Sequence, residues 1–348
     1  MASRLEREVL RFIRRYARRS APEAAFEALA LKLFAHQFEH NATYQKFCLL
    51  EGAGPGRVKR WKDIPAMPAA AFKEFVLVSF AQKKTVKVFR TSGTTGSPRG
   101  AHFFESLRLY EASLAAAFDK FVLPDRPSLD WHFLAMPPSE APDSSLSHMM
   151  GVLNRRHAMG RARYYVTRSA ARHDLLAEDL AAARRPVILL ATAFSLKGFL
   201  DFLKASGTRI RLKRGSRLME TGGFKGRARE ISKIELHADC AARLGLDERF
   251  CVSEYGMTEL SSQFYDTTLR DAVKGFRRRP FMEGPAWARA VLADGLIRVF
   301  DLANLGSVMA VQTEDTGRRA GGGFELTGRA EASELRGCSL AYEKFVAS

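Results

Sequence analysis

The sequence is poor in cysteine and has no long apolar run. No window of about 18 consecutive apolar residues occurs, so a transmembrane helix is not expected. Residues 1–20 lack the apolar segment of a secretory signal, and we therefore expect a cytoplasmic protein with free thiols. The cysteines form no CxxC pair and match no zinc-ligand spacing. They are Cys48, Cys240, Cys251 and Cys338.

Acidic residues are also scarce relative to basic ones. The chain has 55 Lys and Arg against 38 Asp and Glu, a net charge of +17. Such a charge can mark a nucleic-acid-binding protein, but the basic residues are scattered and no helix-turn-helix, RNP or zinc-finger pattern is present. These absences argue against nucleic acid as a partner. A basic surface also steers anionic substrates towards an enzyme.

The 348 residues are 46% apolar, enough for a large core in one domain or two. We expect residues 1–80 to form a mainly helical segment packed on the body, and residues 81–348 to form an α/β body with a short tail. Apolar residues at helical spacing between Leu5 and Tyr16 predict a first helix, which Ser3 and Glu6 would open as a capping box. This helix should dock on the body, with a membrane-surface helix as the alternative.

From there strand-like and helix-like runs alternate, which predicts an α/β protein with mixed or parallel sheets flanked by helices. Ligands of such sheets bind at the carboxyl ends of strands, so the loops there should hold the site. The predicted strands are 85–89, 132–136, 187–193, 296–300 and 308–313, and the predicted helices are 107–121, 175–183, 196–205 and 227–244.

The most informative segment is the loop of residues 91–100, TSGTTGSPRG, directly after the first of these strands. Its three glycines let the backbone approach an anion, and its five hydroxyl groups supply donors for phosphate oxygens. It is not a Walker-A loop, and a flexible polar turn is the alternative. The candidate phosphate ligands are Thr91, Ser92, Gly93, Thr94, Thr95, Gly96 and Arg99.

This loop resembles the phosphate loop of the acyl-adenylate-forming enzymes, which include acyl-CoA synthetases, peptide-synthetase adenylation domains and firefly luciferase. The pattern usually ends in lysine, whereas Arg99 keeps the charge and can bind phosphate with two nitrogens. The resemblance implies ATP and Mg²⁺ as cofactors and a carboxylic acid as substrate. It also implies the large N-terminal domain of these enzymes as the fold.

Residues 253–259, SEYGMTE, resemble the second signature of the same superfamily. The resemblance implies that Tyr255 and Gly256 lie against adenine, that Thr258 bonds the α-phosphate and that Glu259 is a ligand of Mg²⁺. The alternative is a helix start with a buried tyrosine. Residues 220–223 are similar to the adenine-binding loop, although an ordinary turn would look the same. The residues of this loop are Glu220, Thr221, Gly222 and Gly223.

Two later motifs complete the resemblance. Asp315 in TEDTG matches the ribose ligand of the superfamily, and Arg329 in the following GR pair matches an arginine that reaches the nucleotide. A turn-capping aspartate is the alternative for Asp315. Most members also carry a C-terminal lid with a catalytic lysine, and residues 330–348 are too few to form it. We therefore expect the lid to be absent.

Four strings narrow the resemblance to the acyl-protein synthetases of bacterial bioluminescence, the LuxE family. They are FAHQFEHN at 34–41, AFKEF at 71–75, PDSSLSHM at 142–149 and ETGGFKGR at 220–227. In that family a cysteine near the C-terminus accepts the acyl group as a thioester and hands it to a partner protein, a reductase or carrier. Cys338 in RGCSL matches this cysteine, although a free cysteine is more often a packed apolar residue.

His148 is a second catalytic candidate, because it lies in a hydroxyl-rich stretch expected to be a loop, where it would orient the carboxylate or the adenylate. A structural histidine is the alternative. The predicted function is thus ATP-dependent activation of a carboxylic acid, in this family a long-chain fatty acid, with transfer to a cysteine. An acyl- or aryl-CoA ligase on the same scaffold and a nucleic-acid-binding protein without chemistry remain open as alternatives.

Overall fold

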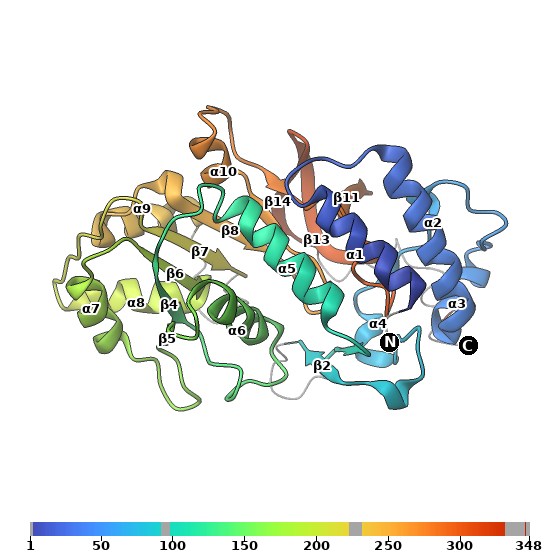
Figure 1. The fold of residues 1–348 in the computed structure, drawn as a ribbon, viewed down its shortest axis with the longest axis horizontal. Coiled ribbons are helices and arrows are strands. Elements are labelled where there is room, and N and C mark those ends of the chain that lie inside the picture. Colours follow the sequence, from blue (N-terminus) through green and yellow to red (C-terminus); the bar gives the residue numbers. More distant parts are fainter. Residues whose placement is uncertain (1–2, 92–97, 223–231, 331–344, 346–348) are drawn as a thin grey trace. The chain divides into compact units, whose positions relative to one another are not determined.

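The computed structural model describes residues 3–91, 98–222, 232–330 and Phe345. Cys338 and several residues of the predicted phosphate and adenine loops lie outside these ranges. The chain divides into two compact units, which are treated separately below (Figure 1). Unit 1 comprises Met1–Ala117, Met257–Phe264 and Phe281–Ser348, and unit 2 comprises Phe118–Gly256 and Tyr265–Pro280.

Unit 2 contains a parallel sheet in the order β5-β4-β6-β7-β8 (Figure 1). Helices connect its strands, as parallel pairing requires. Its elements are β4 (Asp130–Leu134), α6 (Ser145–His157), β5 (Arg163–Tyr164), α7 (His173–Ala182), β6 (Val187–Thr192), α8 (Ala193–Ala205), β7 (Arg217–Thr221), α9 (Lys233–Leu244), β8 (Cys251–Tyr255) and α10 (Thr268–Val273).

The sheet of unit 2 is covered by helices on both faces. Val187, Leu189 and Ala191 of β6 pack in one core with apolar residues of α7, α8 and α9. On the other face Trp131 of β4 stacks on His157 of α6, with ring centroids 5.4 Å apart. Strands that are buried on both faces consist of nearly continuous apolar residues, and this explains why the run 187–193 predicted a strand correctly.

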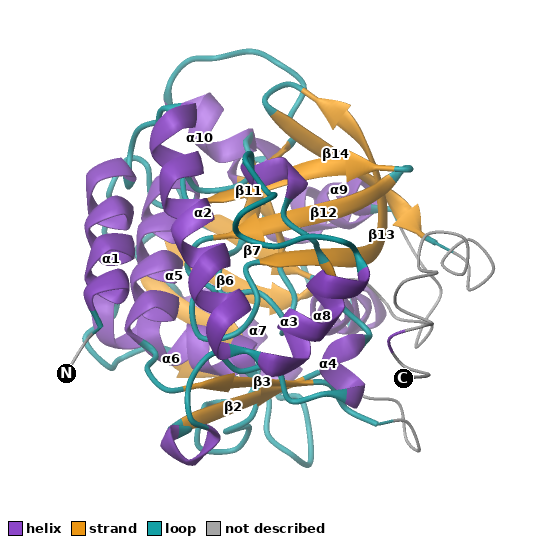
Figure 2. Cartoon of the chain, turned by 90° about the vertical axis from the view of Figure 1, so that its right-hand side faces the viewer, coloured by secondary structure: helices purple, strands orange, loops and turns teal. Residues whose placement is uncertain are grey.

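Unit 1 is built on an antiparallel sheet in the order β11-β12-β13-β14-β10, with β1 parallel to β13 (Figure 2). A separate hairpin consists of β2 and β3. The strands are β1 (Met67–Pro68), β2 (Lys87–Arg90), β3 (Ala101–Phe104), β10 (Met282–Glu283), β11 (Ala288–Ala293), β12 (Leu296–Asp301), β13 (Ala310–Ala320) and β14 (Gly323–Arg329), while β9 (Phe264–Asp266) begins in unit 1 and ends in unit 2.

Helices pack on this sheet, so the predicted α/β class with mixed sheets and flanking helices is confirmed. Trp61 lies between Phe26 of α2 and Phe300 of β12, with ring centroids 5.2 and 4.8 Å away. The buried amide of Gln37 donates to the carbonyl of Asn304 over 2.8 Å and fixes α2 to the loop after β12. The helices are α1 (Arg4–Tyr16), α2 (Glu23–His40), α3 (Ala42–Leu50), α4 (Ala71–Glu74) and α5 (Arg108–Phe121), which continues into unit 2.

The N-terminal helix α1 is docked, as its apolar spacing predicted. Val9 and Ile13 are buried, and Ser3 caps the helix by accepting the backbone N–H of Glu6 over 3.0 Å. The predicted capping box is only half formed, because the Glu6 carboxylate instead accepts a bond from Ser106. Within the described part of the chain no helix is long and apolar enough to cross a membrane.

Candidate functional site

The predicted phosphate loop is the tip of the hairpin formed by β2 and β3 in unit 1. Thr91 and Gly100 form its neck: the Thr91 N–H donates to the Gly100 carbonyl, and the Gly100 N–H donates to Thr91 Oγ1, both over 2.9 Å. The exposed Arg99 donates from Nε to the Thr91 carbonyl over 2.6 Å. The ends of the loop are therefore held together, while residues 92–97 lie outside the described ranges.

His102 lies on β3 and connects the β2–β3 hairpin to the SEYGMTE motif. Its Nδ1 lies 2.8 Å from the Thr258 carbonyl oxygen, which can only accept, so Nδ1 carries the proton. Burial lowers the pKa of His102 to about 4, against the opposing effect of this bond, and the ring is neutral at pH 7. The sequence placed His102 just beyond the phosphate loop but did not link it to Thr258, because nothing in the sequence relates it to a residue 156 positions later.

A buried network of neutral donors fixes the residues that follow Thr258. Asn304 donates to the Glu259 carbonyl over 2.8 Å and accepts from Ser261 Oγ over 2.6 Å. Asp301 accepts from the Ser261 N–H and from Ser262 Oγ, over 2.9 and 2.6 Å. Burial raises the pKa of Asp301 to about 6, against these hydrogen bonds. The position of Glu259 thus depends on the loop after β12.

The predicted ribose ligand Asp315 lies directly opposite the predicted nucleotide-binding Arg329, on the paired strands β13 and β14. The Arg329 guanidinium forms an ion pair with Glu314. Partial burial acts to lower the pKa of Arg329, but the carboxylates of Glu314, Asp315 and Glu259 raise it overall. Three predicted site residues from separate segments, Glu259, Asp315 and Arg329, therefore share one electrostatic environment in unit 1.

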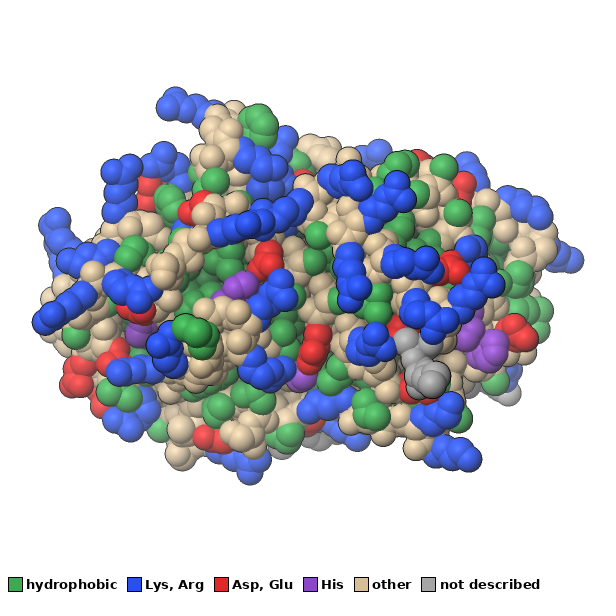
Figure 3. All heavy atoms as spheres, viewed as in Figure 1, with side chains coloured by type: hydrophobic (Ala, Val, Ile, Leu, Met, Phe, Trp, Pro, Cys, Tyr) green, Lys and Arg blue, Asp and Glu red, His purple; other side chains and the backbone are tan. Residues whose placement is uncertain are grey.

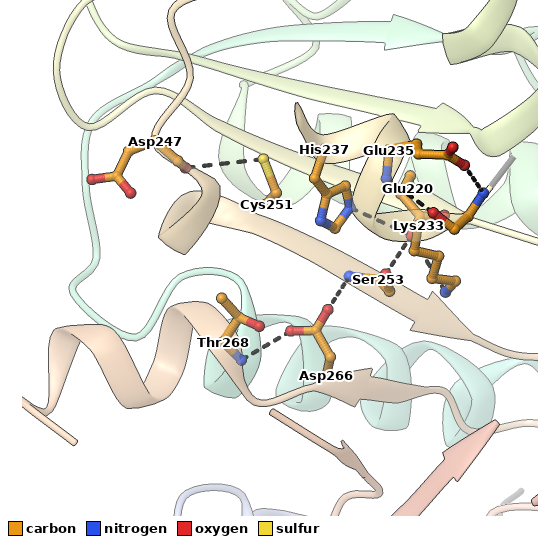
Figure 4. A network of polar contacts seen from close by, with 10 residues as sticks. Glu220, Lys233, Glu235, His237, Asp247, Cys251, Ser253, Asp266 and Thr268 are labelled. Carbon is orange, nitrogen blue, oxygen red and sulfur yellow. Dashed lines mark hydrogen bonds and ion pairs between the residues drawn. The ribbon is translucent and has the colours of Figure 1, made fainter. Parts of the chain in front are cut away.

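In unit 2 the predicted adenine-binding residues lie at the carboxyl ends of β7 and β8, the edge where ligands of parallel sheets bind. Thr221 Oγ1 donates to the Glu254 carboxylate, and Ser253 Oγ donates to that of Glu220 (Figure 4 shows the latter). Both bonds join the two strands side by side, because Glu220 pairs with Ser253 and Thr221 with Glu254 in the strand register.

The carboxylates of this edge have opposite proton affinities. Burial acts to raise the pKa of Glu220, but His237, Lys233 and Ser253 outweigh it, so that the pKa is lowered. Burial raises the pKa of Glu254 to about 7, with the Glu220 charge adding to the effect and Thr221 and Lys233 opposing it. At neutral pH Glu220 is ionised and Glu254 is poised between its two forms.

Three further predicted residues occupy the same edge of unit 2. Tyr255 ends β8 and is 9% exposed, the exposed Gly256 follows it, and Gly222 comes directly after β7 with φ +75°. Only glycine adopts that φ without strain, which accounts for a glycine at this position. Gly223 lies outside the described residues. The SEYGMTE motif passes from unit 2 to unit 1 between Gly256 and Met257.

His148 is not in a loop, and this part of the prediction is wrong. It occupies the first turn of α6, where its N–H donates to the Ser144 carbonyl over 3.0 Å and Ser144 caps the helix. The hydroxyl-rich stretch that suggested a loop supplies this cap, since serine is favoured at helix N-termini. The α6 N-terminus follows β4 and so begins at the carboxyl edge of the sheet.

The three described cysteines are free, as expected, and buried, and burial raises their pKa values, for Cys48 and Cys240 to about 12. Cys338 lies outside the described residues. Phe345, farther along the chain, is buried against Phe47 and Phe75, with ring centroids 5.9 and 4.8 Å away. The chain after β14 therefore contacts unit 1 again at Phe345.

The described residues offer few ligands for a metal ion. Among residues 3–91, 98–222, 232–330 and 345, no three His, Cys, Asp or Glu side chains cluster closely enough to hold an ion alone. Mg²⁺ in nucleotide sites usually takes one or two carboxylates together with phosphate oxygens. The single carboxylate of Glu259, close enough to raise the pKa of Arg329, fits that requirement.

On the face shown in Figure 3 and in one pocket of unit 2, the described residues give no separate indication of the predicted chemistry. Figure 3 shows Lys and Arg scattered over one face with Asp and Glu among them, as expected for a solvated basic surface. A pocket of about 390 Å³ lies at the amino ends of β7 and β8, lined in part by Lys213, Arg214 and Phe250. It is at the edge opposite to Thr221 and Tyr255.

Comparison with solved structures identifies the fold. A 2-hydroxyisobutyryl-CoA ligase in the postadenylation state with 2-HIB-AMP matches 90% of this chain and 69% of its own, with a TM-score of 0.63 and 14% identity. The chain shares the fold of this ligase. The open conformation, with 2-HIB-AMP and CoA, covers 90% and 71%, with a TM-score of 0.62 and 13% identity. No family model and no curated protein matches the sequence.

Several residues of the site could not be found from sequence patterns. Lys233, His237 and Glu254 belong to the network around Glu220, and Asp301 and Asn304 belong to the network around Glu259. Their partners are distant in sequence. Only Glu254 carried a signal, since a carboxylate inside an apolar strand is rarely buried without a partner.

Proposed function

We propose that this protein uses ATP to activate a carboxylic acid. A carboxylate oxygen attacks the α-phosphorus of ATP, the bond from that phosphorus to the bridging oxygen breaks, and pyrophosphate leaves with the electron pair. The product is an acyl-adenylate. The substrate class that the sequence favours is a long-chain fatty acid.

One observation carries this proposal: Glu259, Asp315 and Arg329 share one environment in unit 1, although they come from three chain segments. A carboxylate for Mg²⁺, a carboxylate for ribose hydroxyls and a guanidinium for phosphate are the groups that a nucleotide needs. The His102 bond to Thr258 adds support, because it attaches the segment after the phosphate loop to the residue assigned to the α-phosphate.

The remaining roles follow the chemistry of the side chains. Arg99 and the hydroxyls and N–H groups of residues 91–97 would stabilise the charge on the phosphates. Thr221, Gly222, Tyr255 and Gly256 would contact adenine, and Glu220 would support them from its buried position. Mg²⁺ held by Glu259 would neutralise phosphate charge. His148 is proposed to orient the carboxylate.

The acyl group would then move to a thiol. We assign this step to Cys338: its thiolate attacks the acyl carbonyl carbon, the bond to the phosphate oxygen breaks and AMP leaves. A thiolate is the suitable nucleophile, and the arginine at position 336 would lower the pKa of the thiol. A partner protein, a reductase or a carrier, would receive the acyl group.

Acid-dependent ATP–pyrophosphate exchange over a panel of acids tests the first step. Asp315→Ala and Arg329→Met should each lower kcat/KM for ATP roughly a hundredfold, because each removes a charged contact to the nucleotide. Arg318→Met is the matched control, since it breaks a cross-strand ion pair with Glu325 on the same two strands. Exchange that is absent with every acid, or unchanged in Asp315→Ala, would contradict the proposal.

Incubation with ATP and a labelled fatty acid tests the second step. Hydroxylamine-labile label should appear on the protein and be absent in Cys338→Ala, while pyrophosphate exchange persists. Cys48→Ala should keep the label, because this thiol is buried and its pKa is about 12. A thioester that forms only on added CoA, with Cys338 dispensable, would establish a CoA ligase instead.

A further inference from the structure

A single buried carboxylate in unit 2 connects the residues on both sides of segment 223–231. Glu220 is the penultimate residue of β7, and its side chain has no exposed surface. Its Oε1 accepts from Ser253 Oγ and lies 3.3 Å from Lys233 Nζ and 3.8 Å from His237 Nε2, both on α9 (Figure 4). Strand β7, before segment 223–231, and helix α9, after it, are therefore joined through the Glu220 carboxylate.

A second bond fixes the neighbouring strand. Glu254 accepts from Thr221 Oγ1, one residue from Glu220, and Tyr255 follows Glu254 directly. Ser253 is held from two sides, because its N–H also donates to Asp266 over 2.5 Å (Figure 4). The backbone that presents Thr221, Gly222 and Tyr255 is therefore anchored by hydrogen bonds of Thr221 and Ser253 to buried carboxylates.

Lys233 is more exposed than His237, the other basic residue near Glu220, whose side chain is 16% exposed. The Lys233 side chain is 41% exposed, whereas Glu220 and Glu254 are buried. Among the described residues, the second oxygen of Glu220 is buried without a hydrogen-bond partner, so the carboxylate depends on the contacts of Oε1. A buried carboxylate that loses its cation is strongly destabilised where it stands. The placement of Glu220 thus depends on Lys233 together with Ser253 and His237.

We propose that Lys233 and Glu254 are positioning residues for nucleotide binding, which act through Glu220 and Thr221 on the ends of β7 and β8. This inference rests on the proposed function, since it concerns the adenosine part of ATP. Adenosine takes no part in bond making, so its contacts are equal in the ground state and the transition state. Loss of positioning should therefore change KM for ATP and leave kcat nearly constant.

The experiment compares Lys233→Met, Lys233→Arg and Glu254→Gln with wild type, by ATP titration calorimetry and by pyrophosphate exchange. Lys233→Met should raise KM and Kd for ATP roughly tenfold with kcat changed less than about twofold, the size expected for one charge-assisted contact. Lys233→Arg restores the cation and should return KM to within about threefold of wild type. Glu254→Gln, which keeps one acceptor for Thr221, should show a smaller rise than Lys233→Met.

Arg249→Met is the matched control, because it removes an exposed ion pair with Asp247 at the opposite end of β8 and should leave KM unchanged. An unchanged KM in Lys233→Met, or a fall in kcat that Lys233→Arg does not rescue, overturns the inference while exchange by wild type upholds the proposed function. Wild-type protein that neither binds ATP nor exchanges pyrophosphate overturns both. If wild-type protein binds ATP but does not exchange pyrophosphate, the Kd values alone test the inference. A Kd that rises roughly tenfold in Lys233→Met supports it, and an unchanged Kd overturns it.

Discussion

Two buried polar networks hold the two halves of the SEYGMTE motif, and they do so with different electrostatics. In unit 2, Ser253 and Glu254 belong to a network of carboxylates and cations around Glu220. In unit 1, Glu259 is fixed by Asn304 within a network of amide, hydroxyl and N–H donors around one carboxylate, that of Asp301. The first network places two carboxylates next to each other, whereas the second surrounds a single carboxylate with neutral donors.

The pKa values of the two central carboxyls reflect this difference. Burial raises both, that of Asp301 to about 6 and that of Glu254 to about 7. Asp301 is satisfied by bonds to both oxygens, which favour its ionised form. Glu254 has the ionised Glu220 beside it, which disfavours a second charge.

The largest effect is expected in unit 1. Asp301→Ala should lower the free energy of unfolding by about 4 kcal/mol, because it leaves the Ser261 and Ala303 N–H groups and the Ser262 hydroxyl buried without partners. Urea unfolding at pH 7 measures this change. Asp63→Ala, at an exposed ion pair with Arg60, should cost under about 1 kcal/mol. Equal losses in the two variants would refute a structural role for the Asp301 network.

The pH response should belong to Glu254. Its pKa is raised from 4.5 to about 7 in the folded state, so the folded state holds the proton more tightly. The contribution is complete below pH 4.5 and is lost as pH rises to 7, about 3 kcal/mol in all. Glu254→Gln should remove this part of the pH dependence and be more stable than wild type at pH 8. If wild type and Glu254→Gln differ in stability by the same amount at pH 5 and at pH 8, Glu254 is not the source of the pH dependence.

Glu220→Gln sharpens the comparison, because it removes the carboxylate that makes unit 2 different. The pKa of Glu254 should fall when the neighbouring charge is absent, because that charge disfavours the ionised form of Glu254. Carboxyl NMR titration of protein labelled at its glutamate and aspartate carboxyls would measure it. The titration of Asp301 in unit 1 serves as the internal control and should not move.

His102→Phe should have the smallest effect, about 1 kcal/mol at pH 7, because the Thr258 carbonyl loses its donor while the ring volume is kept. The wild-type contribution declines as pH falls, since the pKa of His102 is lowered from 6.5 to about 4 and the unfolded chain takes up the proton first. The gap between variant and wild type should therefore shrink as pH falls below 6.5 and reverse before pH 4, because the wild type loses about 3 kcal/mol over that range. Thermal unfolding at pH 7 and at pH 4 measures both differences.

Much of the fold was predictable because periodicity is a local property. The buried run of β6 and the helical spacing of α1 and α5 were found within a few residues of their bounds. The antiparallel sheet of unit 1 was not predicted, although Asp294 and Gly295 form a turn with φ +51° and +79° between β11 and β12. That Asp-Gly pair between apolar runs is a hairpin signal that the sequence contained.

The residues of the candidate site could likewise be predicted only in part. Motif residues such as Asp315 and Arg329 could be proposed from a resemblance, and the structure places them opposite each other. The networks that support the motif could not be proposed, because the bond from Asn304 to Glu259 joins residues 45 positions apart. Such pairs are set by the packing of whole strands, and a single sequence carries no trace of them.

The neck of the β2–β3 hairpin has a consequence for how this protein can change. Three of its contacts, from Thr91 N–H, Gly100 N–H and Arg99 Nε, end on backbone or hydroxyl groups of Thr91 and Gly100. None of them requires a particular side chain at positions 92–97. Composition and length there can drift under selection, or be redesigned for another anion, with little cost to the sheet that carries the loop.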